Sequence, residues 1–155
     1  MIEIKPPSKL PSEPGLKIFL AGSIEMGNAI DWQTQVVTSL FDTQVTVLNP
    51  RRDEWDSSWE QSITNPMFVE QVSWELDALA MSDIIAMYLD PDTAAPISLL
   101  EFGQYYQSGK LMIACPPGFH KRGNIEICCA RSDVILLDSL EDLIKTLKQL
   151  ISQLS

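Results

Sequence analysis

Short apolar runs alternate with helical patterns along most of this 155-residue chain, and this alternation constrains the fold more than any other feature. Five runs predict strands, at residues 17–22, 44–50, 83–90, 110–116 and 133–138. Helical patterns cover residues 28–41, 66–81, 97–108, 122–131 and 140–154. Strands that alternate with helices predict a parallel sheet whose two faces are both covered by helices.

The predicted fold class is α/β: a single-domain, flavodoxin-like three-layer sandwich. Right-handed crossovers leave few arrangements, and we predict a five-stranded parallel sheet in the order 2-1-3-4-5. Residues 1–15 contain four prolines and are expected to form an extended or mobile N-terminal lead-in, followed by the domain at residues 16–155. In the helix at 66–81, we expect Leu76, Leu79 and Ala80 to face the core.

Composition excludes several classes of function. The chain is 45% hydrophobic, enough for a packed core, and its net charge of -10 argues against a nucleic-acid partner. No apolar run is long enough for a signal peptide core or a membrane span, so no membrane partner is expected. The cysteines, Cys115, Cys128 and Cys129, form no C-x-x-C motif, which predicts free thiols and a cytoplasmic protein. We expect no metal and no cofactor.

In an open parallel sheet, ligands bind at the carboxyl ends of the strands, beside the point where the strand order reverses. Here that point lies between the first and third predicted strands, so the loops at 22–28 and 90–98 are candidates for the site. Gly22 and Ser23 begin the first of these loops, and small residues there let a ligand approach the backbone. Asp92 lies in the second loop, where a functional role is more plausible than for an ordinary surface carboxylate.

Glu101 stands in the first turns of the helix at 97–108, between Leu100 and Phe102. A carboxylate in that setting should be partly buried at the carboxyl edge of the sheet. It could serve as a catalytic group, or it could merely stabilise the helix dipole. Asp77 lies on a helix face with Glu70 and Trp74, and on pattern alone it reads as part of a solvated acidic stripe.

The long polar segment at 51–64 carries two tryptophans, Trp55 and Trp59. Tryptophans in such a loop either fill a gap over the sheet or stack on a planar ligand, so both are candidate substrate-binding residues. Arg51 and Arg52 begin the same segment and represent either surface charge or a phosphate clamp.

Four segments together resemble the nucleoside 2-deoxyribosyltransferase superfamily over roughly residues 17–140. They are IFLAGSIEMG after the lead-in, WELDALAMSDIIAMYLDPD, SLLEFG and RGNIEI, with NPRRDEWDSSW after the second strand resembling a subgroup of transferase-like proteins. The resemblance implies a flavodoxin-like enzyme that cleaves the N-glycosidic bond of a nucleoside and takes a free base as its second substrate.

The resemblance also implies roles for individual residues. Glu101 matches the nucleophile, which attacks the anomeric carbon and holds the sugar as a covalent ester. Asp77 matches an aspartate near the base and is the candidate proton donor. Asn124 matches an asparagine that reaches the sugar in a neighbouring subunit, which implies a homo-oligomer. The pattern departs at Ala95, where well-studied transferases carry an aspartate; Asp92 could replace it only if the loop is rearranged.

The expected activity is therefore transfer of a 2-deoxyribosyl group between bases, or hydrolysis if water enters instead. One alternative is an N-glycosidase of 2′-deoxynucleoside 5′-monophosphates, for which Ser23, Ser98 and the two arginines could bind phosphate, while Glu25 argues against it. The other is a non-catalytic nucleotide-binding module, suggested by the missing acid at Ala95.

Overall fold

The predicted sheet is present, with one strand more than expected. The computed structural model describes residues 1–24 and 29–154, whose strands form one parallel sheet in the order β1-β3-β2-β4-β5-β6. The strands are β1 (Ile2–Ile4), β2 (Lys17–Gly22), β3 (Thr46–Leu48), β4 (Ile84–Tyr88), β5 (Leu111–Ala114) and β6 (Ile135–Leu137). Without β1, this is the predicted order 2-1-3-4-5; the predicted number of five strands was wrong because β1 adds an edge.

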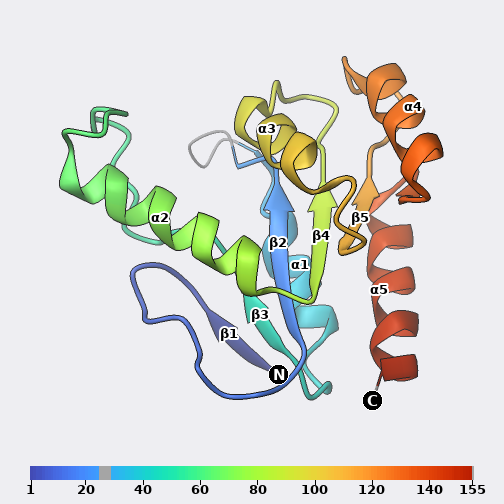
Figure 1. The fold of residues 1–155 in the computed structure, drawn as a ribbon, viewed down its shortest axis with the longest axis horizontal. Coiled ribbons are helices and arrows are strands. Elements are labelled where there is room, and N and C mark those ends of the chain that lie inside the picture. The colour runs from blue at the N-terminus through green and yellow to red at the C-terminus, as the bar shows by residue number, and fades with distance from the viewer. Residues whose placement is uncertain (25–28, 155) are drawn as a thin grey trace.

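Helices cover both faces of the sheet, which makes three layers. They are α1 (Trp32–Ser39), α2 (Pro66–Met81), α3 (Pro96–Tyr105), α4 (Arg122–Ser132) and α5 (Leu140–Leu154). One core cluster joins the sheet to α2, α3 and α4, and a second joins it to α1 and α5. Figure 1 shows α2 and α3 in front of the strands and α1 behind them. Within residues 1–24 and 29–154, no helix has the length and apolar character needed to cross a membrane.

Helix α2 spans the predicted range, but it presents a different face to the core. Its first turn is capped by Asn65, whose side chain accepts a hydrogen bond from the Met67 N–H, with a proline next in the chain. The residues it buries are Gln71, Trp74, Ala78 and Leu79. The expectation that Leu76 and Ala80 face the core was wrong: both are exposed, because the buried stripe lies one residue position away.

The N-terminal segment packs on the domain rather than only leading into it. β1 pairs with β3, and Lys5 Nζ forms an ion pair of 2.7 Å with Asp53. The chain then crosses α2, where the Trp74 indole N–H donates to the Ser8 carbonyl at 2.8 Å. Leu10 packs against the same core cluster as α2. This first strand was not predicted because its three residues precede a proline-rich stretch, where an extended lead-in was expected.

The strand order reverses between β2 and β4, where the two backbones approach very closely. A Cβ atom on Gly22 would lie 2.1 Å from the Tyr88 carbonyl oxygen and 2.9 Å from the Trp32 ring. Gly22 also has φ of +143°, a conformation that residues with a side chain rarely adopt. Only glycine fits this position, which gives Gly22 a structural role independent of any ligand.

Replacement of Gly22 by alanine should therefore lower the free energy of unfolding by more than about 3 kcal/mol, since both strain and steric overlap act together. Urea denaturation followed by tryptophan fluorescence measures this loss. Gly103 is the matched control, because a Cβ there meets nothing within 4 Å and the residue lies inside α3. Gly103→Ala should stabilise the protein by about 0.5–1 kcal/mol. Equal effects of the two substitutions would contradict this account.

Candidate functional site

The candidate site begins at the amino end of α3, directly after the carboxyl end of β4. Ala95 stands before the first turn with φ of 47°, in the left-handed region, and Pro96 begins the helix. This strained entry turns the next residues toward the sheet, where Ser98, Glu101 and Phe102 become buried. Helix α3 packs against β2, so the Glu101 carboxyl group lies beside the point where the strand order reverses.

Glu101 is a buried carboxyl group with an altered protonation equilibrium. Its side chain is only 8% exposed. Burial raises the pKa of Glu101 to about 8, and the negative charge of nearby Glu75 on α2 adds to the rise. Burial also raises the pKa of Glu75 itself. Both shifts disfavour the ionised forms, and since the charge of Glu75 acts on Glu101, the two carboxyl groups titrate as a pair.

Glu75 is held by a buried amide. The side-chain nitrogen of Gln71, one helical turn earlier, donates to Glu75 Oε1 at 2.7 Å and to the Pro50 carbonyl at 3.0 Å. This hydrogen bond to Glu75 partly offsets the effect of burial on the pKa of that carboxyl. The contact to Pro50 joins α2 to the chain just after β3. The segment after β3, α2 and α3 therefore meet around the carboxyl pair.

The segment after β3 contributes an aromatic and cationic cluster. Arg52 is 8% exposed, forms an ion pair of 2.9 Å with Glu70 of α2, and lies 5.1 Å from the ring centre of Trp59. Trp55 packs edge-on against Trp59, with 5.1 Å between ring centres. The two predicted tryptophans thus lie together and next to Arg52. The arginine is anchored to the helix that carries Glu75.

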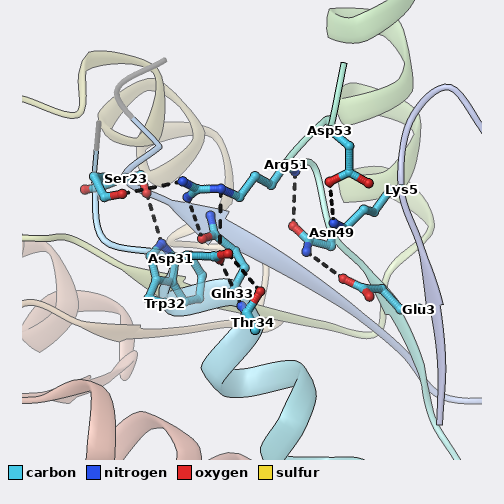
Figure 2. A network of polar contacts seen from close by, with 11 residues as sticks. Glu3, Lys5, Ser23, Asp31, Trp32, Gln33, Thr34, Asn49, Arg51 and Asp53 are labelled. Carbon is cyan, nitrogen blue, oxygen red and sulfur yellow. Dashed lines mark hydrogen bonds and ion pairs between the residues drawn. The ribbon is translucent and has the colours of Figure 1, made fainter. Parts of the chain in front are cut away.

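Arg51 belongs to a different network, shown in Figure 2. Its guanidinium donates to Gln33 Oε1 at 3.3 Å and to the Ala29 carbonyl at 3.5 Å, and lies 3.9 Å from Asp31. Its backbone N–H donates to Asn49 Oδ1 at 3.0 Å. Arg51 therefore ties the end of β3 to the start of α1, with its charge facing protein groups.

Ser23 is completely buried, and its hydroxyl bridges the two loops at the strand reversal. It accepts a hydrogen bond from the Asp90 N–H at 3.0 Å and lies 2.7 Å from Thr93 Oγ1. Because the Thr93 hydroxyl donates to the Asp90 carbonyl at 2.8 Å, the Ser23 hydroxyl is the donor to Thr93. These contacts connect the loops after β2 and β4. Glu25 and Gly27, in the first of these loops, lie outside the described residues.

The other predicted site residues lie farther from the carboxyl pair or at the surface. Asp77 is exposed on α2, and Asp92 is exposed in the loop after β4. Asn124 is exposed on α4 and lines a groove between α3 and α4 with Phe102 and Tyr106. Within residues 1–24 and 29–154, no cluster of three or more His, Cys, Asp or Glu residues is arranged to hold a metal ion.

Sequence reasoning missed Glu75 and Gln71, although α2 carries a signal for both. Counting back from buried Ala78 and Leu79 in steps of three or four residues places positions 75 and 71 on the same stripe. Polar residues on an otherwise apolar stripe indicate buried polar groups. Burial of such groups lowers the stability of the fold, so their presence points to a function.

The comparisons with known proteins agree with this fold. The family described as "Nucleoside 2-deoxyribosyltransferase like" matches residues 15–119. A conserved protein from Enterococcus faecalis V583 has a similar structure, with a TM-score of 0.60 and 15% identity over 88% of this chain and 99% of its own. A 2-deoxyribosyltransferase from Bacillus psychrosaccharolyticus is similar too, with a TM-score of 0.57 and 21% identity over 83% of this chain and 90% of its own. A search of the curated proteins found no match.

The fold and site together define an α/β protein with a buried glutamate, Glu101, near the half-buried Glu75 at the carboxyl edge of a parallel sheet. Since the family match covers most of the chain, the protein belongs to the nucleoside 2-deoxyribosyltransferase-like family. The resemblance seen in the sequence is thereby confirmed.

The raised pKa of Glu101 predicts how stability depends on pH. Folding raises this pKa from 4.5 to about 8, so the contribution of the neutral carboxyl is complete below pH 4.5 and is lost as pH rises through about 8. Glu101→Gln stays neutral at every pH. Its stability relative to the wild type should therefore increase between those limits by a few kcal/mol, roughly 1.4 kcal/mol per unit of pKa shift.

Thermal unfolding of both proteins at a series of pH values measures this difference. Glu13→Gln removes an exposed carboxylate elsewhere in the chain and serves as the control for loss of one negative charge. An identical pH dependence of wild type and Glu101→Gln would refute the raised pKa.

Proposed function

We propose that the protein cleaves the N-glycosidic bond of 2′-deoxynucleosides and transfers the 2-deoxyribosyl group to another base, with Glu101 as nucleophile. The observation that carries this proposal is the buried carboxyl group of Glu101, with the half-buried Glu75 close enough to raise its pKa, at the carboxyl edge of the sheet. Cleavage of a C1′–N bond builds positive charge on the sugar, which a buried carboxylate stabilises strongly. A second carboxyl group nearby supplies the proton that the departing base needs.

In the first step, a Glu101 carboxylate oxygen attacks C1′ and forms an ester with the sugar. The electron pair of the C1′–N bond goes to the base nitrogen, which takes a proton from Glu75. In the second step, a nitrogen of an incoming base attacks C1′, its proton passes to the Glu75 carboxylate, and the ester bond breaks to restore Glu101. If water attacks instead, the same steps give hydrolysis.

This chemistry needs one proton on the pair, with Glu101 ionised and Glu75 neutral. Burial keeps a proton on Glu101 in the free protein at neutral pH, because its pKa is raised to about 8. The proposed mechanism requires that this proton move to Glu75 before Glu101 attacks. In this proposal, Glu75 takes the role of proton donor that the family resemblance implied for Asp77. Asp77 remains the alternative donor, although its exposed position on α2 favours Glu75.

The surroundings favour a nucleoside over a nucleoside monophosphate. Arg51 and Arg52 face Asp31 and Glu70, and the Ser23 hydroxyl is buried between two loops. A phosphate would have to compete with these protein partners for each donor. The net charge of -10 also disfavours a doubly charged phosphate group. Trp55 and Trp59, beside Arg52, are proposed to border the base, with Gly22, Asp92 and Ser98 nearer the strand reversal.

Two further features complete the proposal. Asn124 is exposed at the groove between α3 and α4, and we assign it to the sugar site of a neighbouring copy in a homo-oligomer. Cys115, Cys128 and Cys129 are free, which is consistent with a cytoplasmic protein. Retention of ligand binding without turnover would instead identify a non-catalytic module.

A chromatographic assay tests the reaction itself. The protein is incubated with each 2′-deoxynucleoside alone, with a second free base, and with each deoxynucleoside monophosphate. We expect a new nucleoside only when the second base is present, and a loss of about 10³-fold or more in Glu101→Ala. Release of base from monophosphates alone would support the hydrolase alternative. The absence of turnover with every substrate would refute the proposal that the protein is an enzyme.

A matched pair of substitutions on α2 identifies the proton donor. Glu75→Gln should lower kcat by about 10²- to 10⁴-fold, because it removes the general acid. Asp77→Asn, on the exposed side of the same helix, should change kcat little. The reverse result would assign proton donation to Asp77.

A further inference from the structure

Gln71 is the most deeply buried polar side chain on α2, at 4% exposed, and its geometry leaves its amide one orientation. A proline carbonyl can only accept a hydrogen bond, so the amide nitrogen must face Pro50. The second N–H of the same nitrogen then points to Glu75 Oε1, at 2.7 Å. The amide therefore offers Glu75 a donor and never an acceptor.

We propose that Gln71 is a positioning residue: its amide, fixed by the Pro50 carbonyl, holds the Glu75 carboxyl group in place and stabilises the charge that Glu75 gains on giving up its proton. This inference rests on the proposed function and extends it to a residue that touches no substrate. A donor already aimed at a developing negative charge lowers the barrier to proton transfer without further rearrangement.

The cost of keeping Gln71 supports a role beyond packing. Its Oε1 is buried and has no hydrogen-bond partner within residues 1–24 and 29–154, which is unfavourable in a protein interior. An apolar side chain of similar size would avoid that cost, but it could not hold Glu75.

The charges packed around the amide leave Glu75 as the group on which it acts. Glu75 lies on the same helix as Gln71, and Glu101 approaches Glu75 from α3. Arg52 is already paired with Glu70 at 2.9 Å. The contact from Pro50 and the ion pair of Arg52 fix the same stretch of chain to the first half of α2. The Gln71 amide is thus fixed between its two acceptors, the Pro50 carbonyl and the Glu75 carboxyl group.

The role also follows from the balance of charge along the reaction. When Glu75 gives its proton to the base, Glu101 has become a neutral ester, so the single negative charge of the pair then lies on Glu75. The N–H bond from Gln71 is strongest in that state, because donors bind an ionised carboxylate more tightly than a neutral one. The same bond keeps Glu75 ionised until the next base or water releases a proton to it.

The test compares Gln71→Met, which keeps the length of the side chain and removes the amide, with Gln35→Met, an exposed glutamine on α1. Two substrates are used: an ordinary 2′-deoxynucleoside, and N7-methyl-2′-deoxyguanosine, whose cationic base leaves as a neutral molecule and needs no proton. Gln71→Met should lower kcat for the ordinary substrate about 10- to 100-fold, the effect of one hydrogen bond to a charged group. The loss should be much smaller with the methylated substrate, and Gln35→Met should match the wild type.

Glu75→Gln should show the same dependence on the leaving group, whereas Glu101→Gln should lose activity with both substrates. An equal loss in Gln71→Met with both substrates, or no loss at all, would overturn the inference.

A second measurement does not depend on turnover and separates this inference from the proposed function. The side-chain carboxyl carbons are labelled with ¹³C and titrated by NMR, with Glu75→Gln used for assignment. Removal of the amide should raise the pKa of Glu75 relative to the wild type, because the carboxylate loses a hydrogen-bond donor. If no substrate is turned over but this shift is present, the proposed function fails while the control of Glu75 by Gln71 stands; an unchanged titration overturns it.

Discussion

The close pairing of β2 with β4 is the constraint on which the rest of this structure depends. At the end of β2, Gly22 brings its backbone so near to Tyr88 that no side chain fits. Ser23 then bonds across to the loop after β4, which directs the chain into α3 and so places Glu101. The position of the candidate nucleophile thus follows from a backbone contact that contains no catalytic group.

Much of the fold could be predicted because buried parallel strands are continuous apolar runs, which stand out in a sequence. The run at 83–90 and the helix at 66–81 are clear examples, and their structural counterparts are β4 and α2. The helix expected from residue 28 begins only at Trp32, since Asp31 caps it by accepting a hydrogen bond from the Thr34 N–H. Periodicity alone gives no such boundary.

The site could be predicted only in part. Glu101 stood out because apolar neighbours surround it, and its burial was expected. Its partner Glu75 was hidden, because α2 carries three acidic residues and the sequence does not show which of them faces the sheet until the buried face of the helix is known. Whether Asp77 or Glu75 faces the sheet depends on the rotation of α2, which the buried Trp74 and Ala78 set through packing. The rotation of α2 is set by tertiary contacts, which the sequence pattern does not reveal.

The edge strand β1 also affects how the site is completed during folding. Ile2 pairs with Thr46, a separation of 44 residues (46 − 2), so β1 gains no backbone partner until β3 is in place. The connection from β1 then crosses α2 and bonds to Trp74, the residue before Glu75. Pairing of this edge strand therefore also restrains the helix that carries the proposed proton donor. The geometry of the site is in this sense coupled to a pairing between two strands that lie far apart in the chain.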